Sequence, residues 1–111
     1  NDAGDYAKAE SYLEMALQLE KQNGGDNTYE YAAILNNLGK LQYLSGNPRK
    51  AIPLLERALV IFGNEVGKES LEYSTVVFNQ GVAWTMLKSP KGKELLLQAL
   101  TLREKKFGKV H

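Results

Sequence analysis

The chain has 111 residues, 43% of them hydrophobic, and its 14 basic and 13 acidic side chains leave a formal net charge of +1. This length suits a single domain, and the balanced charge provides no whole-chain attraction to nucleic acid or to an anionic membrane. There is no cysteine, which excludes disulfides and thiolate metal sites and suits a reducing compartment, so we expect a cytoplasmic protein. No apolar run is long enough to cross a bilayer, and the first residues lack the basic and apolar regions of a signal peptide.

Apolar residues recur with a helical period in five stretches, which glycine, proline and capping residues separate from one another. The pattern predicts helices over residues 5–22, 29–45, 48–64, 71–87 and 90–107. The apolar side of the first helix is predicted to contain Ala9, Tyr12, Leu13, Ala16, Leu17 and Leu19. The expected N-caps are Asp5, Thr28, Asn47, Ser70 and Ser89.

The sequence repeats itself after 42 residues. This shift places Gly4 on Gly46, Ala9 on Ala51, Leu13 on Leu55, Ala16 on Ala58, Leu17 on Leu59, Gly25 on Gly67, Tyr31 on Tyr73, Asn37 on Asn79 and Gly39 on Gly81. After residue 81 the offset becomes 41, which we interpret as one residue missing from the turn near residues 88–90. A repeat of this length indicates a solenoid, in which each unit buries its apolar face against its neighbours.

We therefore predict an all-α fold, a right-handed superhelical solenoid of antiparallel helix hairpins. Residues 1–25 are interpreted as the second half of a repeat, and residues 26–67 and 68–111 as one repeat each. Both ends of the chain look cut from a longer array.

Small residues mark the place where the two helices of the central hairpin are expected to approach most closely. Gly39, Ala51 and Ala58 lie where a larger side chain would be forced into the opposing helix. In the next unit Gly92 replaces Ala51, and a glycine inside a helix costs up to about 1 kcal/mol relative to alanine. We therefore expect the last hairpin to be packed less well.

Two runs carry a family resemblance, Leu35-x-x-Leu38-Gly39 and Ala51-x-x-x-Leu55-x-x-Ala58. Their small and large residues at these spacings resemble the tetratricopeptide repeat, although the usual repeat has about 34 residues. The longer form seen here, together with the sequence of residues 102–109, resembles the kinesin light chain class of these repeats. The likeness covers nearly the whole chain, and it implies a scaffold whose front helices line a groove for a peptide.

Asn37 and Asn79 recur in mid-helix one repeat apart, although asparagine favours helix caps. The resemblance implies that they hydrogen-bond the backbone of an extended peptide; the alternative is that they only join neighbouring repeats. Lys40, one turn after Asn36, is a basic groove candidate or a plainly solvated side chain.

Phe78 and Met86 are expected to be exposed in this groove, unless they pack into the core instead. The full set of predicted groove residues is Asn36, Asn37, Lys40, Tyr43, Thr75, Phe78, Asn79, Val82 and Met86.

Catalytic constellations are missing from the sequence, because the single histidine is His111 at the end and no nucleophile elbow or metal-spaced carboxylate cluster is present. We predict no enzyme, no cofactor and no metal. The predicted function is a protein-interaction scaffold that binds a short linear peptide or helix of a partner protein in its concave groove, with neither nucleic acid nor membrane as a partner. The alternative is a structural spacer or self-assembly element without a free groove, self-associating through its cut repeat ends.

Overall fold

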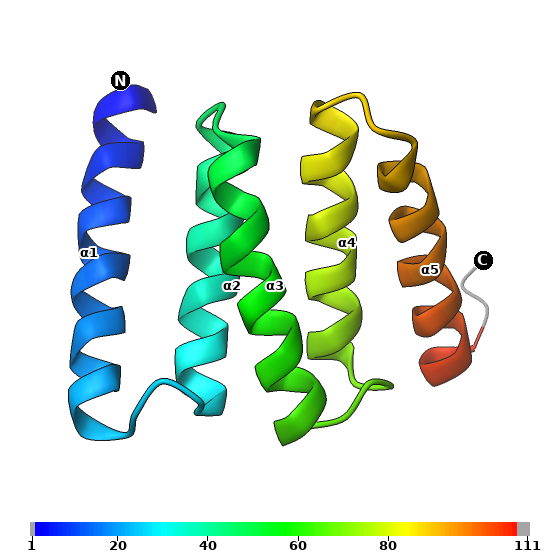
Figure 1. Ribbon diagram of the computed structural model, residues 1–111, viewed down its shortest axis with the longest axis horizontal. Helices are drawn as coiled ribbons and strands as arrows, with labels where there is room; N and C mark the ends of the chain where they lie inside the picture. Colours follow the sequence, from blue (N-terminus) through cyan, green and yellow to red (C-terminus); the bar gives the residue numbers. More distant parts are fainter. Residues whose placement is uncertain (1, 109–111) are drawn as a thin grey trace.

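The computed structural model describes residues 2–108, which form five α-helices and no strand (Figure 1). The helices run alternately up and down, so that each is antiparallel to the one before it. The all-α prediction is confirmed, and the predicted helix bounds hold to within three residues. The helices are α1 (Asp2–Asn23), α2 (Tyr29–Leu44), α3 (Pro48–Glu65), α4 (Leu71–Met86) and α5 (Pro90–Phe107).

Three of the predicted N-caps act through their side chains. The hydroxyls of Thr28, Ser70 and Ser89 each accept a hydrogen bond from a backbone N–H of the following turn, at 3.0, 3.1 and 3.2 Å respectively. Asn47 stands at the N-cap position of α3 but makes no such bond. The prediction for Asp5 is wrong, since α1 already begins at Asp2. Ala3 favours a helix and a single glycine at position 4 does not stop one, so the helix continues through this segment.

The two helices of the central hairpin, α2 and α3, meet at a glycine as predicted. Gly39 is buried, and Ala51 and Ala58 are completely buried opposite it. A Cβ atom built on Gly39 would lie 2.7 Å from Leu55 Cδ2, closer than side-chain carbon atoms normally approach. The absence of a side chain at Gly39 therefore sets the separation of the two helices.

The second hairpin, α4 and α5, is packed even more closely, which corrects two expectations. Each hairpin turn has three residues, 45–47 and 87–89, so the missing residue lies in the first turn of α5 and not in the connecting turn. Gly92 is consequently buried against α4, where a Cβ atom would lie 2.6 Å from the backbone nitrogen of Thr85 and 2.9 Å from the carbonyl oxygen of Gly81. Glycine at this position allows the contact and does not weaken it.

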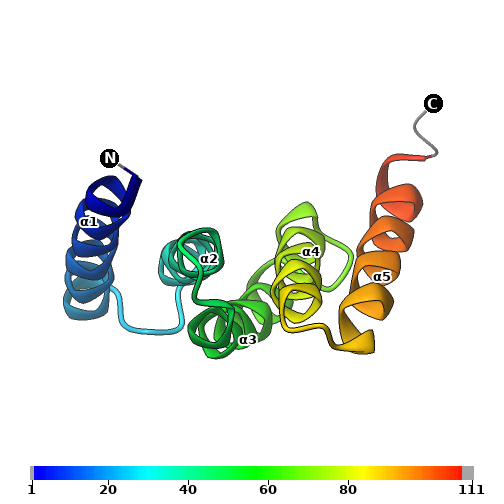
Figure 2. The same ribbon diagram turned by 90° about the horizontal axis from the view of Figure 1, so that it is seen from above.

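The two hairpins form a single stack through α3, which contacts both α2 and α4. Seen from above, α2 and α4 lie in one row and α3 lies in a second row between them (Figure 2). The two helices of the first row, which we call the front helices, also contact each other. This arrangement brings residues one repeat apart to neighbouring positions on one face of the protein.

Helix α1 packs against α2 alone, and this changes the expected burial of its apolar side. Ala9, Leu13 and Leu17 are half-buried, whereas Tyr12 and Leu19 are 65% and 57% exposed. These two residues occupy the positions of Leu54 and Ile61 in α3 after the shift of 42 residues. Their exposure follows because no described helix covers that side of α1.

Replacing Gly92 with alanine should lower the free energy of unfolding by about 1–3 kcal/mol, because the added methyl group meets backbone atoms that have no room to move. This loss should outweigh the roughly 1 kcal/mol that alanine gains over glycine in a helix. Gly63→Ala is the matched control, since a Cβ atom there lies 3.4 Å from Tyr73 Cε2, an ordinary contact distance. The control should be neutral or stabilising in urea unfolding. Equal tolerance of the two changes would show that Gly92 is not at a close contact.

Candidate peptide-binding groove

The front helices expose a ladder of side chains that repeats after 42 residues, and we call this surface the front groove. Its residues are Tyr29, Ala33, Asn36, Asn37, Lys40 and Leu44 on α2, and Leu71, Thr75, Phe78, Val82 and Met86 on α4. The spacing of three or four residues within each helix keeps all of these on one side. Between the two helices lies a hollow of about 280 Å³. Its lining consists of Tyr29, Ala33, Asn36, Asn37, Phe62, Leu71, Glu72 and Thr75.

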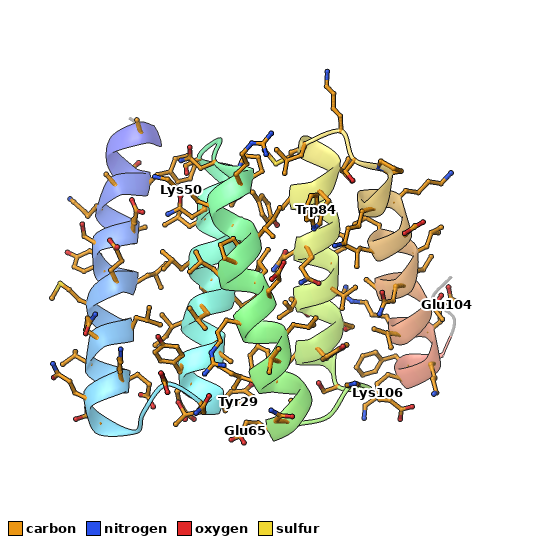
Figure 3. All side chains as sticks on the ribbon, viewed as in Figure 1. Tyr29, Lys50, Glu65, Trp84, Glu104 and Lys106 are labelled. Carbon is orange, nitrogen blue, oxygen red and sulfur yellow. The ribbon has the colours of Figure 1, made fainter. Side chains whose placement is uncertain are left out.

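The floor of this hollow is aromatic, and one end of it is closed by a hydrogen bond. Phe62 of α3 is buried between the front helices and packs edge-on against Tyr29, with ring centroids 5.2 Å apart. Figure 3 shows Tyr29 at the start of α2, close to α3. The Tyr29 hydroxyl donates to Glu72 Oε2 at 2.8 Å, linking α2 to α4. This bond to the carboxylate raises the pKa of Tyr29 above its usual value.

Asn79 and Tyr43 lie beneath the front groove, which corrects their predicted place on its surface. They are only 3% and 5% exposed. The Tyr43 hydroxyl donates to Asn79 Oδ1 at 2.8 Å, and Asn79 Nδ2 donates to Asn36 Oδ1 at 3.0 Å. For Asn79 the structure therefore matches the alternative considered from the sequence, a side chain that joins neighbouring repeats.

The other predicted polar residues are accessible. Asn36 is half-buried in the wall of the hollow, while Asn37 and Lys40 are exposed. Asn37 and Asn79 are equivalent in the repeat but differ in environment. Asn79 packs against the preceding front helix, α2, whereas no front helix precedes α2 among the described residues to cover Asn37. The side chain of Asn37 has no hydrogen-bond partner among residues 2–108. Its contact with a peptide stays a prediction.

Two of the predicted groove residues on α4, Phe78 and Met86, face outward and not into the core. Phe78 is 42% and Met86 is 45% exposed, and Thr75 and Val82 beside them are half-buried. Arg103 of α5 lies beside these residues of α4, with its guanidinium carbon 5.8 Å from the centre of the Phe78 ring. The same guanidinium donates to Thr75 Oγ1 at 3.3 Å. The edge of the front groove that borders α5 is therefore cationic.

The predicted set lacks four residues of the front groove, Tyr29, Ala33, Leu44 and Leu71, and it also lacks Arg103, which contacts Thr75 from α5. Tyr29 and Leu71 are one repeat apart, and each lies one helical turn before a residue of the ladder. That spacing was a usable signal for both. Arg103 is on α5, which is not one of the front helices, and nothing in its local sequence indicates that its side chain reaches the front groove.

The comparison with known families agrees with this geometry. The tetratricopeptide repeat pattern matches residues 1–63, which is more than half of the chain and includes α1, α2 and most of α3. The chain belongs to the tetratricopeptide repeat family. No curated protein matches it as a relative. Helices α4 and α5 lie beyond the matched residues, and they continue the same hairpin and spacing.

Tetratricopeptide repeats are non-catalytic repeats that mediate protein–protein interaction. Among residues 2–108 no group of three histidine, cysteine, aspartate or glutamate side chains is arranged to hold a metal ion. Within the same residues no helix is long and apolar enough to cross a bilayer. His111, the single histidine, lies outside the described residues. The repeat surface thus offers apolar contact and hydrogen bonding.

The bond between Tyr43 and Asn79 predicts a pH dependence of stability. Burial raises the pKa of Tyr43 above its usual value of about 10. The stabilisation that the protonated Tyr43 hydroxyl provides is therefore fully present below about pH 10. It is lost as the pH rises through the pKa of Tyr43 in the folded state. Tyr43→Phe should cost about 1–3 kcal/mol at pH 8, because the buried Asn79 oxygen loses its donor.

The difference in unfolding free energy between the wild-type domain and Tyr43→Phe should then shrink as the pH rises from about 8 to about 11. Urea unfolding at several pH values measures it. Tyr12→Phe, at a site that is 65% exposed, serves as the control and should be close to wild type throughout. A difference for Tyr43→Phe that stays constant over this range would contradict the assigned role of the hydroxyl.

Proposed function

We propose that the domain binds a short linear segment of a partner protein along the front groove. The observation that carries the proposal is the apolar strip of α4, on which Leu71, Phe78 and Met86 are each more than two-fifths exposed along one helix face. Large apolar side chains gathered on one face are typical of a surface that another protein covers.

The dimensions of the front groove suit a peptide or a single helix. The strip from Leu71 to Met86 extends over about 22 Å, since a helix rises about 1.5 Å per residue. Apolar surface covered by a partner contributes about 25 cal/mol per Å² before the cost of association is subtracted. The hollow of about 280 Å³ beside Phe62 is large enough for one side chain of the partner, and the rest of the segment would lie along the strip.

Charge at the groove gives the partner segment a direction. Lys40, on α2, and Arg103, on α5, lie beside the apolar strip of α4. Glu72 is at the end of the front groove that its hydrogen bond to Tyr29 closes. An acidic group on the segment is therefore favoured near Phe78 and disfavoured near Tyr29. We further propose that the repeats are of the kinesin light chain class, which the length of 42 residues and the sequence of residues 102–109 favour. We extend the proposal to a cytoplasmic location, consistent with the cysteine-free sequence.

A second candidate function rests on the two end helices. Tyr12, Met15 and Leu19 are exposed on α1, and Leu97 and Leu100 are exposed on α5. These faces would suit a spacer or a self-assembly element that is covered on both sides by further helices. Binding of a peptide requires the strip of α4, whereas the spacer or self-assembly function requires the exposed faces of α1 and α5.

The proposal predicts that Phe78→Ser weakens peptide binding by about tenfold or more, because one fully covered aromatic side chain contributes about 1.5–3 kcal/mol. The probes are synthetic peptides enriched from a phage-displayed random-peptide library on the wild-type domain, with affinities measured by fluorescence polarisation. Phe107→Ser is the matched control, because Phe107 is 58% exposed but lies on α5 outside the front groove.

The control should bind like the wild-type domain, and both variants should keep their far-UV helical signal. If the library yields no peptide, or if Phe107→Ser weakens binding as much as Phe78→Ser, the front groove is not the binding surface. Self-association of the wild-type domain in sedimentation velocity, lost on Leu19→Ser and kept on Phe78→Ser, would instead favour the spacer.

A further inference from the structure

We propose that Asn36 presents its side-chain donor, Nδ2, to a segment bound in the front groove, and that Tyr43 and Asn79 hold it in that orientation. The inference rests on the proposed function and specifies one contact within it. It also assigns the direct polar contact to Asn36, where the sequence pattern pointed to Asn37 and Asn79.

The first link in the chain is the Tyr43 hydroxyl, which carries one proton and is almost completely buried. Its only partner among the described residues is the side-chain amide of Asn79. The proton therefore has to go to the amide oxygen, because an amide nitrogen accepts no hydrogen bond. Turning the Asn79 amide around would leave a buried hydroxyl proton without an acceptor, which costs about 1–3 kcal/mol.

The second link follows from the first. With Asn79 Oδ1 facing Tyr43, Asn79 Nδ2 faces Asn36, on the same helix α2, and donates to Asn36 Oδ1 at 3.0 Å. This bond turns the oxygen of Asn36 toward α4. The other end of the same amide group is Nδ2, whose N–H donors are left for another partner.

The third link is the position of Asn36. It lies in the wall of the hollow beside the Phe62 floor, and it is half-buried. Its Nδ2 has no partner among residues 2–108. The chain of hydrogen bonds therefore runs in one direction, from Tyr43 through Asn79 to Asn36, and ends with a donor at the wall of the front groove.

The ligand group at this point is then a hydrogen-bond acceptor oxygen. Either a backbone carbonyl of the bound segment or a carboxylate or amide oxygen of one of its side chains has the required chemistry. A donor group placed here would meet the Asn36 N–H groups and lose a hydrogen bond that it makes in water. Asn36 thus selects register and orientation of the segment, while Phe78 and the strip supply apolar contact.

The test is Asn36→Asp compared with Asn64→Asp, which makes the same substitution at an exposed position of α3 outside the front groove. In Asn36→Asp one carboxylate oxygen still accepts from Asn79, but the other presents an acceptor to the front groove. Binding of the selected library peptides should fall by about tenfold or more at pH 7. Asn64→Asp should bind within about threefold of the wild-type domain, because its added charge is not in the front groove.

Lowering the pH supplies a second readout. Protonated aspartate has an O–H donor and a carbonyl acceptor, so it restores the pattern that Asn36 has. The binding defect of Asn36→Asp should therefore decrease as the pH falls from 7 to about 4, near the usual pKa of aspartate. Wild-type protein and Asn64→Asp, with circular dichroism recorded in parallel, show how far the lower pH affects binding and folding in general.

Tyr43→Phe tests the orienting role separately. Without the hydroxyl the Asn79 amide is free to turn, so the binding penalty of Asn36→Asp should become smaller in this background than in the wild-type one. A purely structural role of Tyr43 would lower stability and leave that penalty unchanged, which would overturn the orienting chain.

The inference fails without the proposed function if Phe78→Ser weakens binding while Asn36→Asp and Asn64→Asp behave alike. It fails together with the proposed function if no peptide binds the front groove. When the defect is confirmed, alanine substitutions along the peptide identify the acceptor. If one alanine abolishes the difference between the wild-type domain and Asn36→Asp, the acceptor is that side chain; if none does, it is a backbone carbonyl.

Discussion

The close approach of two antiparallel helices at a glycine is the contact on which the rest of the structure depends. In the central hairpin a side chain on Gly39 would run into Leu55, and in the second hairpin a side chain on Gly92 would run into the backbone of α4. Because interiors are close-packed, an added carbon at Gly39 would displace the Leu55 side chain, and at Gly92 it would displace the backbone of α4. The separation within each hairpin in turn decides where α3 meets its neighbours, and therefore how far apart the front helices lie.

A buried polar chain then fixes the front helices relative to each other. Asn79, in the middle of α4, bonds to Asn36 in the middle of α2 and to Tyr43 near its end, and Tyr29 with Glu72 connects the starts of the two helices. Buried hydrogen bonds have strict geometry, and breaking one leaves a polar group without water or partner. The stability of the stack and the shape of the front groove consequently come from the same side chains. A change that loosens the repeat interface is expected to alter binding as well.

Much of the fold was predictable, because its causes are local or periodic. The caps at Thr28, Ser70 and Ser89 act within four residues of their own position, and the 42-residue repeat marks equivalent faces of successive hairpins. The exposure of Phe78 and Met86 also followed from their place in the helical period. The start of α1 was misplaced because Asp2 and Asp5 are equally suitable residue types at a helix start.

The sequence by itself determined the number of helices, their antiparallel pairing and the front face, since these depend on period, turn residues and small side chains. Only the tertiary structure decided which residues of that face are accessible. Asn37 and Asn79 have the same place in the repeat, yet one is exposed and the other is buried against α2. Gly92 looked like a weak point and is instead required by the approach of α4. The physical reason is the same in both cases: burial and hydrogen bonding depend on the neighbouring helix, and the repeat gives no information on what that neighbour places at each site.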